Sequence, residues 1–193
     1  MHDPREADSA AEHMLVVAAQ HQPAAFDALY RRYVGPIYRY VRGRVGNQLD
    51  AEDVTAQVFY QALVALPHYR LTEHPFAAWL FRIARNCVVS HLRRRPALPL
   101  DAVAEPNGAH PSQEDLVVRR ELVREVGRAV RRLDVARQEL LALYYGAGLH
   151  VPEIARVLGR SEASTYKLLE RTVAALRREF EEKEQGDGAS RDA

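Results

Sequence analysis

Residues 151–173 read VPEIARVLGRSEASTYKLLERTV, and their pattern fits two short helices separated by a turn. Pro152 suits the first turn of a helix, because the amide that proline lacks would have no partner there. Gly159 favours a tight turn after the apolar run, and Ser161 can cap the helix that follows. The stretch therefore predicts a helical pair, and apolar steps of three and four residues continue in both directions from it.

The second helix of this pair divides into an inward and an outward face. Five positions recur at helical steps and are predicted to point inward, namely Thr165, Leu169, Val173, Leu176 and Phe180. Near its beginning, the outward face carries Ser164, Tyr166, Lys167 and Arg171. Two helices joined by a glycine-containing turn, with polar residues starting the second, are typical of a helix-turn-helix that enters the major groove of DNA. The alternative is an ordinary helical hairpin, but the spacing of Pro, Gly and Ser favours DNA binding.

Two further helices and a linker are expected before this pair. Ser112 and Asp115 can cap one helix, and Asp134 can cap another, which ends at the Gly-Ala-Gly of 146–148. Residues 96–112 hold four of the ten prolines and show no apolar period, which predicts an extended linker. The sequence thus predicts two small domains on either side of the linker.

The first half is predicted to contain three helices. Apolar residues recur at helical steps from Phe26, and the Gly-Pro pair at 35–36 should kink or divide that helix. Asp50 can accept the free amide of residue 53 as a cap, so a second helix should cover 51–66. Pro75 fits the first turn of a third helix. We therefore expect an all-α protein of two small helical domains.

Charge is balanced over the whole chain but uneven locally. There are 27 Lys and Arg against 26 Asp and Glu, and the net charge of +1 excludes a uniformly basic nucleic-acid binder. Between residues 74 and 100, however, there are five arginines and no acidic residue. This block is either a patch for DNA phosphates or a solvated face whose arginine stems cover apolar neighbours. Trp79 falls on the apolar stripe of the same helix, which favours a core role over base stacking.

Several function classes find no support in the sequence. Cys87 is the only cysteine, so neither an intrachain disulfide nor a cysteine zinc cluster can form. The eight histidines form no spaced ligand pair, and no glycine-rich phosphate loop occurs. The acidic start lacks the pattern of a secretory signal, and no apolar run is long enough for a bilayer. We expect a cytoplasmic protein without membrane insertion, enzymatic activity, metal or cofactor.

Four stretches of the sequence, taken in order, form a recognisable set. Three lie in the first half: FDALYRRYVGPIYRYVRGRVGN (26–47), DAEDVTAQVFYQAL (50–63) and PFAAWLFRIARNCVVSHLRRR (75–95). The fourth is LLALYYGAGLHVPEIARVLGRSEASTYKLLERTVAALRR (140–178). Together they resemble the bacterial sigma factors of the extracytoplasmic-function (ECF) type, the short two-domain initiation subunits of RNA polymerase, with the first three similar to sigma region 2 and the fourth to sigma region 4. The resemblance implies region 2 over 24–95, a linker over 96–112 and region 4 over 113–182. The termini, 1–23 and 183–193, are expected to be disordered.

The resemblance also implies partners and contact residues. Region 2 would bind core RNA polymerase and the minus-ten promoter element, region 4 would read the minus-thirty-five element, and an anti-sigma factor is a further hypothetical partner. The polymerase contacts carried over are Asp50, Glu52, Asp53 and Gln57. The DNA contacts are Arg82, Arg85, Asn86, Arg93 and Arg94 in region 2, and Ser164, Tyr166, Lys167 and Arg171 in region 4. A conventional helix-turn-helix regulator is the rival interpretation, but it leaves 24–95 unexplained.

Overall fold

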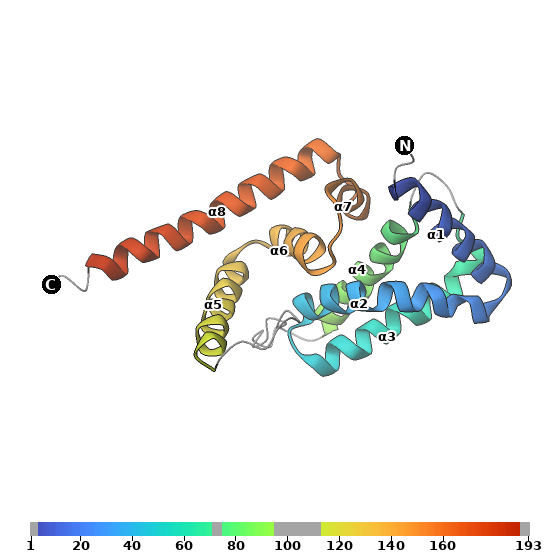
Figure 1. Ribbon diagram of the computed structural model, residues 1–193, viewed down its shortest axis with the longest axis horizontal. Helices are drawn as coiled ribbons and strands as arrows, with labels where there is room; N and C mark the ends of the chain where they lie inside the picture. The colour runs from blue at the N-terminus through green and yellow to red at the C-terminus, as the bar shows by residue number, and fades with distance from the viewer. Residues whose placement is uncertain (1–3, 71–74, 95–112, 190–193) are drawn as a thin grey trace.

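The computed structural model describes residues 4–70, 75–94 and 113–189, and every regular element in these ranges is helical. This confirms the predicted all-α class. In Figure 1, the elements of the first half form a bundle at one end of the molecule. They are α1 Pro4–His21, η1 Pro23–Ala25, α2 Phe26–Val45, α3 Gln48–Ala65, η2 Leu66–His68 and α4 Phe76–Arg94. The second half contains α5 Gln113–Arg132, α6 Val135–Leu141, η3 Ala142–Gly146, α7 Val151–Leu158 and α8 Glu162–Ala189.

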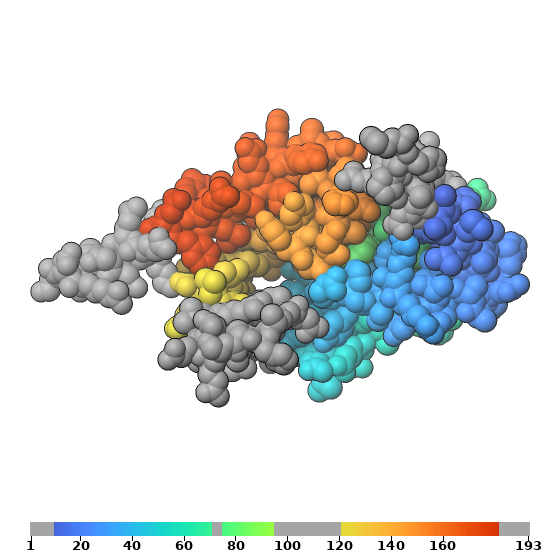
Figure 2. All heavy atoms as spheres, in the orientation of Figure 1, coloured from blue at the N-terminus to red at the C-terminus, as the bar shows by residue number. Residues whose placement is uncertain are grey.

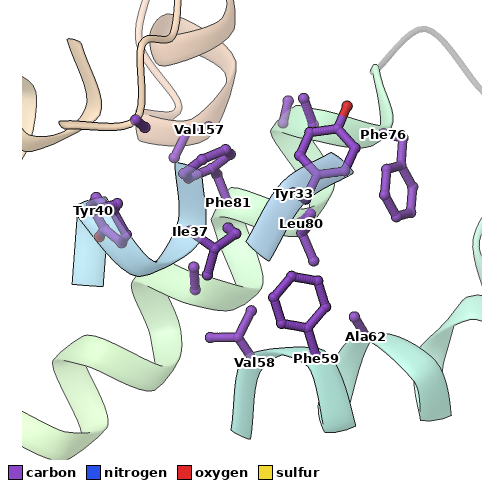
Figure 3. Packing of buried hydrophobic residues seen from close by; sticks show 14 of the residues in the cluster. Tyr33, Ile37, Tyr40, Val58, Phe59, Ala62, Phe76, Leu80, Phe81 and Val157 are labelled. Carbon is purple, nitrogen blue, oxygen red and sulfur yellow. The ribbon is translucent and has the colours of Figure 1, made fainter. Parts of the chain in front are cut away.

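The first half has a core of large apolar side chains from α1, α2, α3 and α4. Leu29, Ile37, Leu80 and Phe81 are fully buried there. Trp79 is half-buried and its ring lies 4.7 Å from that of Tyr69, so it packs on the core as expected. Figure 3 shows how the residues of α2, α3 and α4 meet in this core.

One expectation for the first half was wrong, and a second is narrowed. Residues 1–23 were expected to be disordered, yet α1 covers most of them and buries Val16 and Ala19 in the core. Of the kink or division expected at the Gly-Pro pair of 35–36, the division does not occur, because α2 runs through the pair as one helix. The proline costs one backbone hydrogen bond, but the burial of Tyr33 and Ile37 on either side of the pair compensates for this loss.

The start of α3 also differs from the prediction. Asn47, rather than Asp50, is the cap, because the Asn47 side chain accepts a hydrogen bond from the Asp50 amide at 2.8 Å. The Asp50 carboxylate in turn accepts from Asn47 Nδ2 at 2.6 Å and lies 3.2 Å from His91 Nε2 of α4. Asp50 is consequently buried, and it joins the start of α3 to the end of α4.

The second half follows the predicted helix boundaries closely. Asp134 caps α6 by accepting from the amide of Arg137, and Ser161 Oγ accepts from the amide of Ser164 at the start of α8. Gly159 ends α7 with φ of 65°, a left-handed conformation that glycine adopts without steric cost. The tail was expected to be disordered from residue 183, but α8 continues through Ala189.

The two halves are packed against each other. α2 contacts η3, and α4 contacts α7. Figure 2 shows the second half lying directly against α2. One apolar cluster continues from Phe81 in α4 to Val157 in α7, as Figure 3 shows. The proposed linker, 96–112, lies outside the described residues, so the division into independent domains stays a prediction. Within the described ranges, no helix has the length and apolar content needed to span a membrane.

Candidate nucleic-acid and protein interface

The exposed face of α3 combines acidic and apolar side chains. Glu52, Asp53 and Gln57 are exposed near its beginning, whereas Asp50 is buried and cannot belong to the same surface. The sequence prediction of four contacts on this helix is therefore reduced to three that a partner can reach. Further along the same face, Tyr60 is 65% exposed and Val64 is 58% exposed.

Sequence reasoning missed these two apolar residues. The signal was present, because residues 53, 57, 60 and 64 recur at steps of three and four and therefore share one face of a helix. A water-exposed apolar stripe of this kind, beside charged side chains, is typical of a surface that binds another protein.

The predicted DNA contacts of α4 separate into two groups. Asn86, Arg93 and Arg94 are exposed with their side chains toward solvent. Arg82 is also exposed, but its Nη2 donates to the carbonyl oxygen of Arg156 in α7 at 2.8 Å. Arg85 is half-buried, and its Nε lies 3.7 Å from Glu139 Oε1 of α6. The helix therefore presents Asn86, Arg93 and Arg94 to solvent. It directs Arg82 and Arg85 toward the second half.

The four predicted contacts of α8 are all exposed, as expected for residues that reach DNA. Ser164, Lys167 and Arg171 lie at helical steps on one face, and Tyr166 is 55% exposed beside them. The inward face is anchored by Thr165 and Thr172, which are fully buried and donate to the backbone oxygens of residues 161 and 168. Thr172 was not predicted as an inward residue, because threonine is neutral in an apolar pattern.

A buried charged cluster between the halves escaped the sequence analysis entirely. Glu139 is 3% exposed and accepts a hydrogen bond from Tyr40 Oη at 2.5 Å. Its other oxygen lies 3.6 Å from Arg44 Nη2. Burial and the neighbouring Glu139 carboxylate raise the pKa of Tyr40 well above its ordinary value, so the hydroxyl stays protonated and donates. The sequence signal was an acidic residue inside the apolar run QELLALYY, where the apolar pattern predicts burial.

A second tyrosine–carboxylate contact joins α1 to α2. Tyr33 Oη donates to Glu12 Oε1, and Arg32 Nε lies 3.7 Å from the same carboxylate oxygen. Burial, together with the Glu12 charge, raises the pKa of Tyr33 well above its ordinary value. Gln20 also donates to the backbone oxygens of Leu66 and Tyr69 at 3.1 and 2.6 Å. These bonds hold α1 on the bundle beside the segment that leads to α4.

The sequence is similar to a protein-family model and to a curated protein of known family. Residues 29–96 fit the family model described as Sigma-70 region 2. The chain is 37% identical over 177 residues to the ECF RNA polymerase sigma factor BldN of Streptomyces coelicolor, covering 90% of this chain and 67% of that protein.

Solved structures show the same fold. CnrH, solved in complex with the cytosolic domain of CnrY, superposes with a TM-score of 0.69 at 25% identity, covering 89% of this chain and 97% of CnrH. RpoE of Bartonella quintana, solved in complex with the anti-sigma factor NepR, has a TM-score of 0.59 at 18% identity, with coverage of 81% and 96%. The chain belongs to the extracytoplasmic-function sigma factors, the initiation subunits that bind core RNA polymerase and direct it to promoters.

Proposed function

We propose that three exposed helix faces divide the steps of initiation between them. The face of α3 docks on core polymerase, the arginine face of α4 holds promoter DNA near the minus-ten element, and the start of α8 reads the minus-thirty-five element. The single observation that carries this assignment is the exposure of the α3 stripe, because a DNA-binding protein acting alone has no use for an acidic and apolar protein-binding face.

The α3 face has two components with different roles in docking. Glu52 and Asp53 supply negative charge, which accelerates encounter with a basic surface and fixes its orientation. Tyr60 and Val64 supply apolar area, which provides affinity once the surfaces meet. The buried Asp50 carboxylate contacts Asn47 Nδ2 and His91 Nε2 and so fixes the start of α3 against α4. We therefore assign Asp50 a positioning role instead of a direct contact with the polymerase.

The two DNA faces differ in what they can recognise. The arginines of α4 suit phosphates, which are contacted without regard to sequence. On α8, Lys167 and Arg171 lie one helical turn apart at the start of the second helix of a helix-turn-helix pair. Arg171 can donate two hydrogen bonds to a guanine edge, and Lys167 can contact a phosphate. Sequence recognition is therefore assigned to α8 and strand positioning to α4.

The proposal includes a cytoplasmic location and a protein regulator. Core polymerase and promoter DNA are reached in the cytoplasm. CnrH is solved in complex with the cytosolic domain of CnrY, and we propose that this chain likewise binds a protein partner, an anti-sigma factor.

Docking is tested by measuring binding of the fluorescently labelled full chain to purified bacterial core polymerase. We expect the double variant Glu52→Ala with Asp53→Ala to bind at least about tenfold more weakly, mainly through a slower association rate at low salt. The matched control is Asp27→Ala with Glu121→Ala, which removes two exposed acids from other helices. Equal binding of both folded double variants would overturn the α3 assignment, and no binding of the wild type would favour a conventional regulator.

A further inference from the structure

One side chain of α1, that of Gln20, is bonded to the turn that follows α3. Its amide nitrogen donates to the carbonyl oxygens of Leu66 and Tyr69, at 3.1 and 2.6 Å. Leu66 begins η2, and Tyr69 directly follows it. The amide of Tyr69 also donates to the Leu66 oxygen, at 3.0 Å. A single glutamine of α1 therefore fixes the direction in which the chain leaves η2.

The side chain of Tyr69 carries this constraint to the start of α4. Tyr69 is buried, and its ring lies 5.8 Å from that of Phe76 and 4.7 Å from that of Trp79. Phe76 also packs on Tyr33 of α2, with ring centroids 5.5 Å apart, a contact that Figure 3 shows. Aromatic pairs at these separations attract each other beyond the area that they bury. The beginning of α4 is thus held in place by the ring of Tyr69.

A second residue of α1 acts on the same tyrosine. Burial, and then the charge of Glu12, raise the pKa of Tyr69 above its ordinary value. The Glu12 carboxylate also accepts a hydrogen bond from Tyr33 Oη. Glu12 and Gln20 are about two helical turns apart on α1. Two separate points of α1 therefore act on the aromatic residues around the start of α4.

Trp79 begins the face of α4 that is proposed to bind DNA. Residues 79, 82, 86 and 93 follow one another at steps of three, four and seven, so they share one side of the helix. Trp79 is half-buried against Tyr69, whereas Arg82, Asn86 and Arg93 are exposed. The contacts of Trp79 consequently determine where this face begins and how it is rotated. Gln20 is linked to that face through Tyr69 and Trp79.

We infer that Gln20 is a positioning residue for promoter opening. Its two hydrogen bonds hold Tyr69, and Tyr69 holds Phe76 and Trp79, so the DNA face of α4 is presented in one orientation to the separating strands. The inference rests on the proposed DNA-binding role of α4. It assigns part of that role to α1, a helix that lies outside the residues matched by the region 2 model. Loss of the Gln20 bonds slows opening and leaves the docking face of α3 intact.

Opening is measured on holoenzyme formed from the full chain and purified bacterial core polymerase. The DNA is one of the chain's own promoters, found by mapping transcript starts, with 2-aminopurine placed in the minus-ten element to report unstacking. Gln20→Met keeps the size and neutrality of the side chain and removes both hydrogen bonds. The matched control is Gln22→Met, which changes an exposed glutamine two residues further on. Binding of each labelled variant to core polymerase is measured in parallel.

Gln20→Met is expected to open the promoter about five- to tenfold more slowly, while its affinity for core polymerase stays within about twofold of the wild type. Gln22→Met should match the wild type in both measurements. Gln20→Lys should recover most of the lost rate, because its ammonium group can donate to both carbonyl oxygens, and Gln22→Lys controls for the added charge.

Three results would overturn the inference. The first is equal opening by Gln20→Met and Gln22→Met. The second is an equal loss of core binding and of opening in Gln20→Met, because Gln20 would then stabilise the bundle as a whole. The third is Gln20→Lys opening as slowly as Gln20→Met, because the hydrogen bonds would then not be the cause of the effect.

A double variant separates this inference from the proposed role of α4. Arg93→Ala with Arg94→Ala removes two exposed arginines from that helix. If the double variant opens the promoter as fast as the wild type, the DNA-binding role of α4 fails. If the double variant is slow and Gln20→Met is not, the role of α4 stands and the positioning role of Gln20 alone fails.

Discussion

The first half of the molecule has its own core, whereas the second half buries its core against the first. Tyr40, Phe81, Leu29 and Leu80 are among the largest fully buried side chains of the bundle. Among the side chains that the structure describes, those of the second half in this group are the aliphatic Leu140, Leu143 and Ile154, and all three belong to the cluster that continues into the bundle. The comparison teaches that the second half, in which we propose that the start of α8 reads DNA, depends on the bundle for part of its core packing.

The largest expected effect tests this asymmetry with core truncations. Phe81→Ala should cost about 3–5 kcal/mol, because its fully buried ring packs against Tyr40 and borders the second half. Ile154→Ala should cost about 2–5 kcal/mol, but only in the second half. Trp79 is the single tryptophan and lies in the first half, so its fluorescence reports that half alone during urea unfolding.

The two probes separate the outcomes. Phe81→Ala should lower the unfolding midpoint seen by both Trp79 fluorescence and circular dichroism. Ile154→Ala should lower the midpoint only for the part of the circular dichroism signal that comes from the second half, and it should leave the fluorescence midpoint unchanged. Tyr60→Ala, at an exposed position, is the control and should change neither midpoint. If Ile154→Ala lowers the fluorescence midpoint as much as Phe81→Ala does, the halves unfold as one unit and the asymmetry is wrong.

An intermediate effect sharpens the contrast between the two DNA faces. Arg171→Ala should relax base preference at one position of the minus-thirty-five element, at a cost of roughly 1–3 kcal/mol there. Lys167→Ala should weaken all sequences alike and reduce the slope of log affinity against log salt by about one. Arg93→Ala on α4 should behave like Lys167→Ala and leave base preference intact.

Transcription from a randomised minus-thirty-five library, with salt titrations of holoenzyme binding, provides these measurements. Unchanged base preference and unchanged affinity in the folded Arg171→Ala and Lys167→Ala variants would reduce residues 151–173 to a structural hairpin.

The smallest effect concerns the helix caps of the two halves. Asn47→Ala and Asp134→Ala each remove a side chain that caps a helix start, and each should cost about 1 kcal/mol. Asn47→Ala should lower the Trp79 fluorescence midpoint, and Asp134→Ala should leave it in place. A fluorescence shift for Asp134→Ala of the same size as for Asn47→Ala would show that the two halves unfold cooperatively, and it would contradict the contrast between them.

In the second half, the sequence predicted the helix boundaries where a local signal determines the backbone, whereas at α3 the local cap Asn47 was missed in favour of Asp50. Asp134, Gly159 and Ser161 act through hydrogen bonds or φ angles within a few residues, and the helix boundaries that they mark were correct. Pro36 shows the limit of such signals, because burial on both sides of it outweighs its local cost. α1 was missed since Val16 and Ala19 gain their burial only from contact with the rest of the bundle.

In the candidate site, too, features set by local spacing were predicted and features set by tertiary contacts were missed. Exposed residues of α8 were predicted correctly, because the face of a helix follows from spacing alone. The burial of Asp50 and Glu139 was not predicted, since it depends on His91 of α4 and Tyr40 of α2, which lie in other helices. A local pattern identifies an acidic residue at a helix start or inside an apolar run, but only the tertiary structure shows that each is enclosed by cationic or hydrogen-bonding side chains from other elements.

The most direct test of the central claim, that this chain directs core polymerase to promoters through α3 and α8, is transcription from its own genomic DNA with purified bacterial core enzyme. The 5′ ends of the transcripts are mapped for the wild type, for Glu52→Ala with Asp53→Ala, and for Arg171→Ala. We predict wild-type starts preceded by two shared sequence elements, fewer transcripts from the same starts for the α3 variant, and altered upstream elements for Arg171→Ala. Wild-type starts no different from those of core enzyme alone would contradict the account.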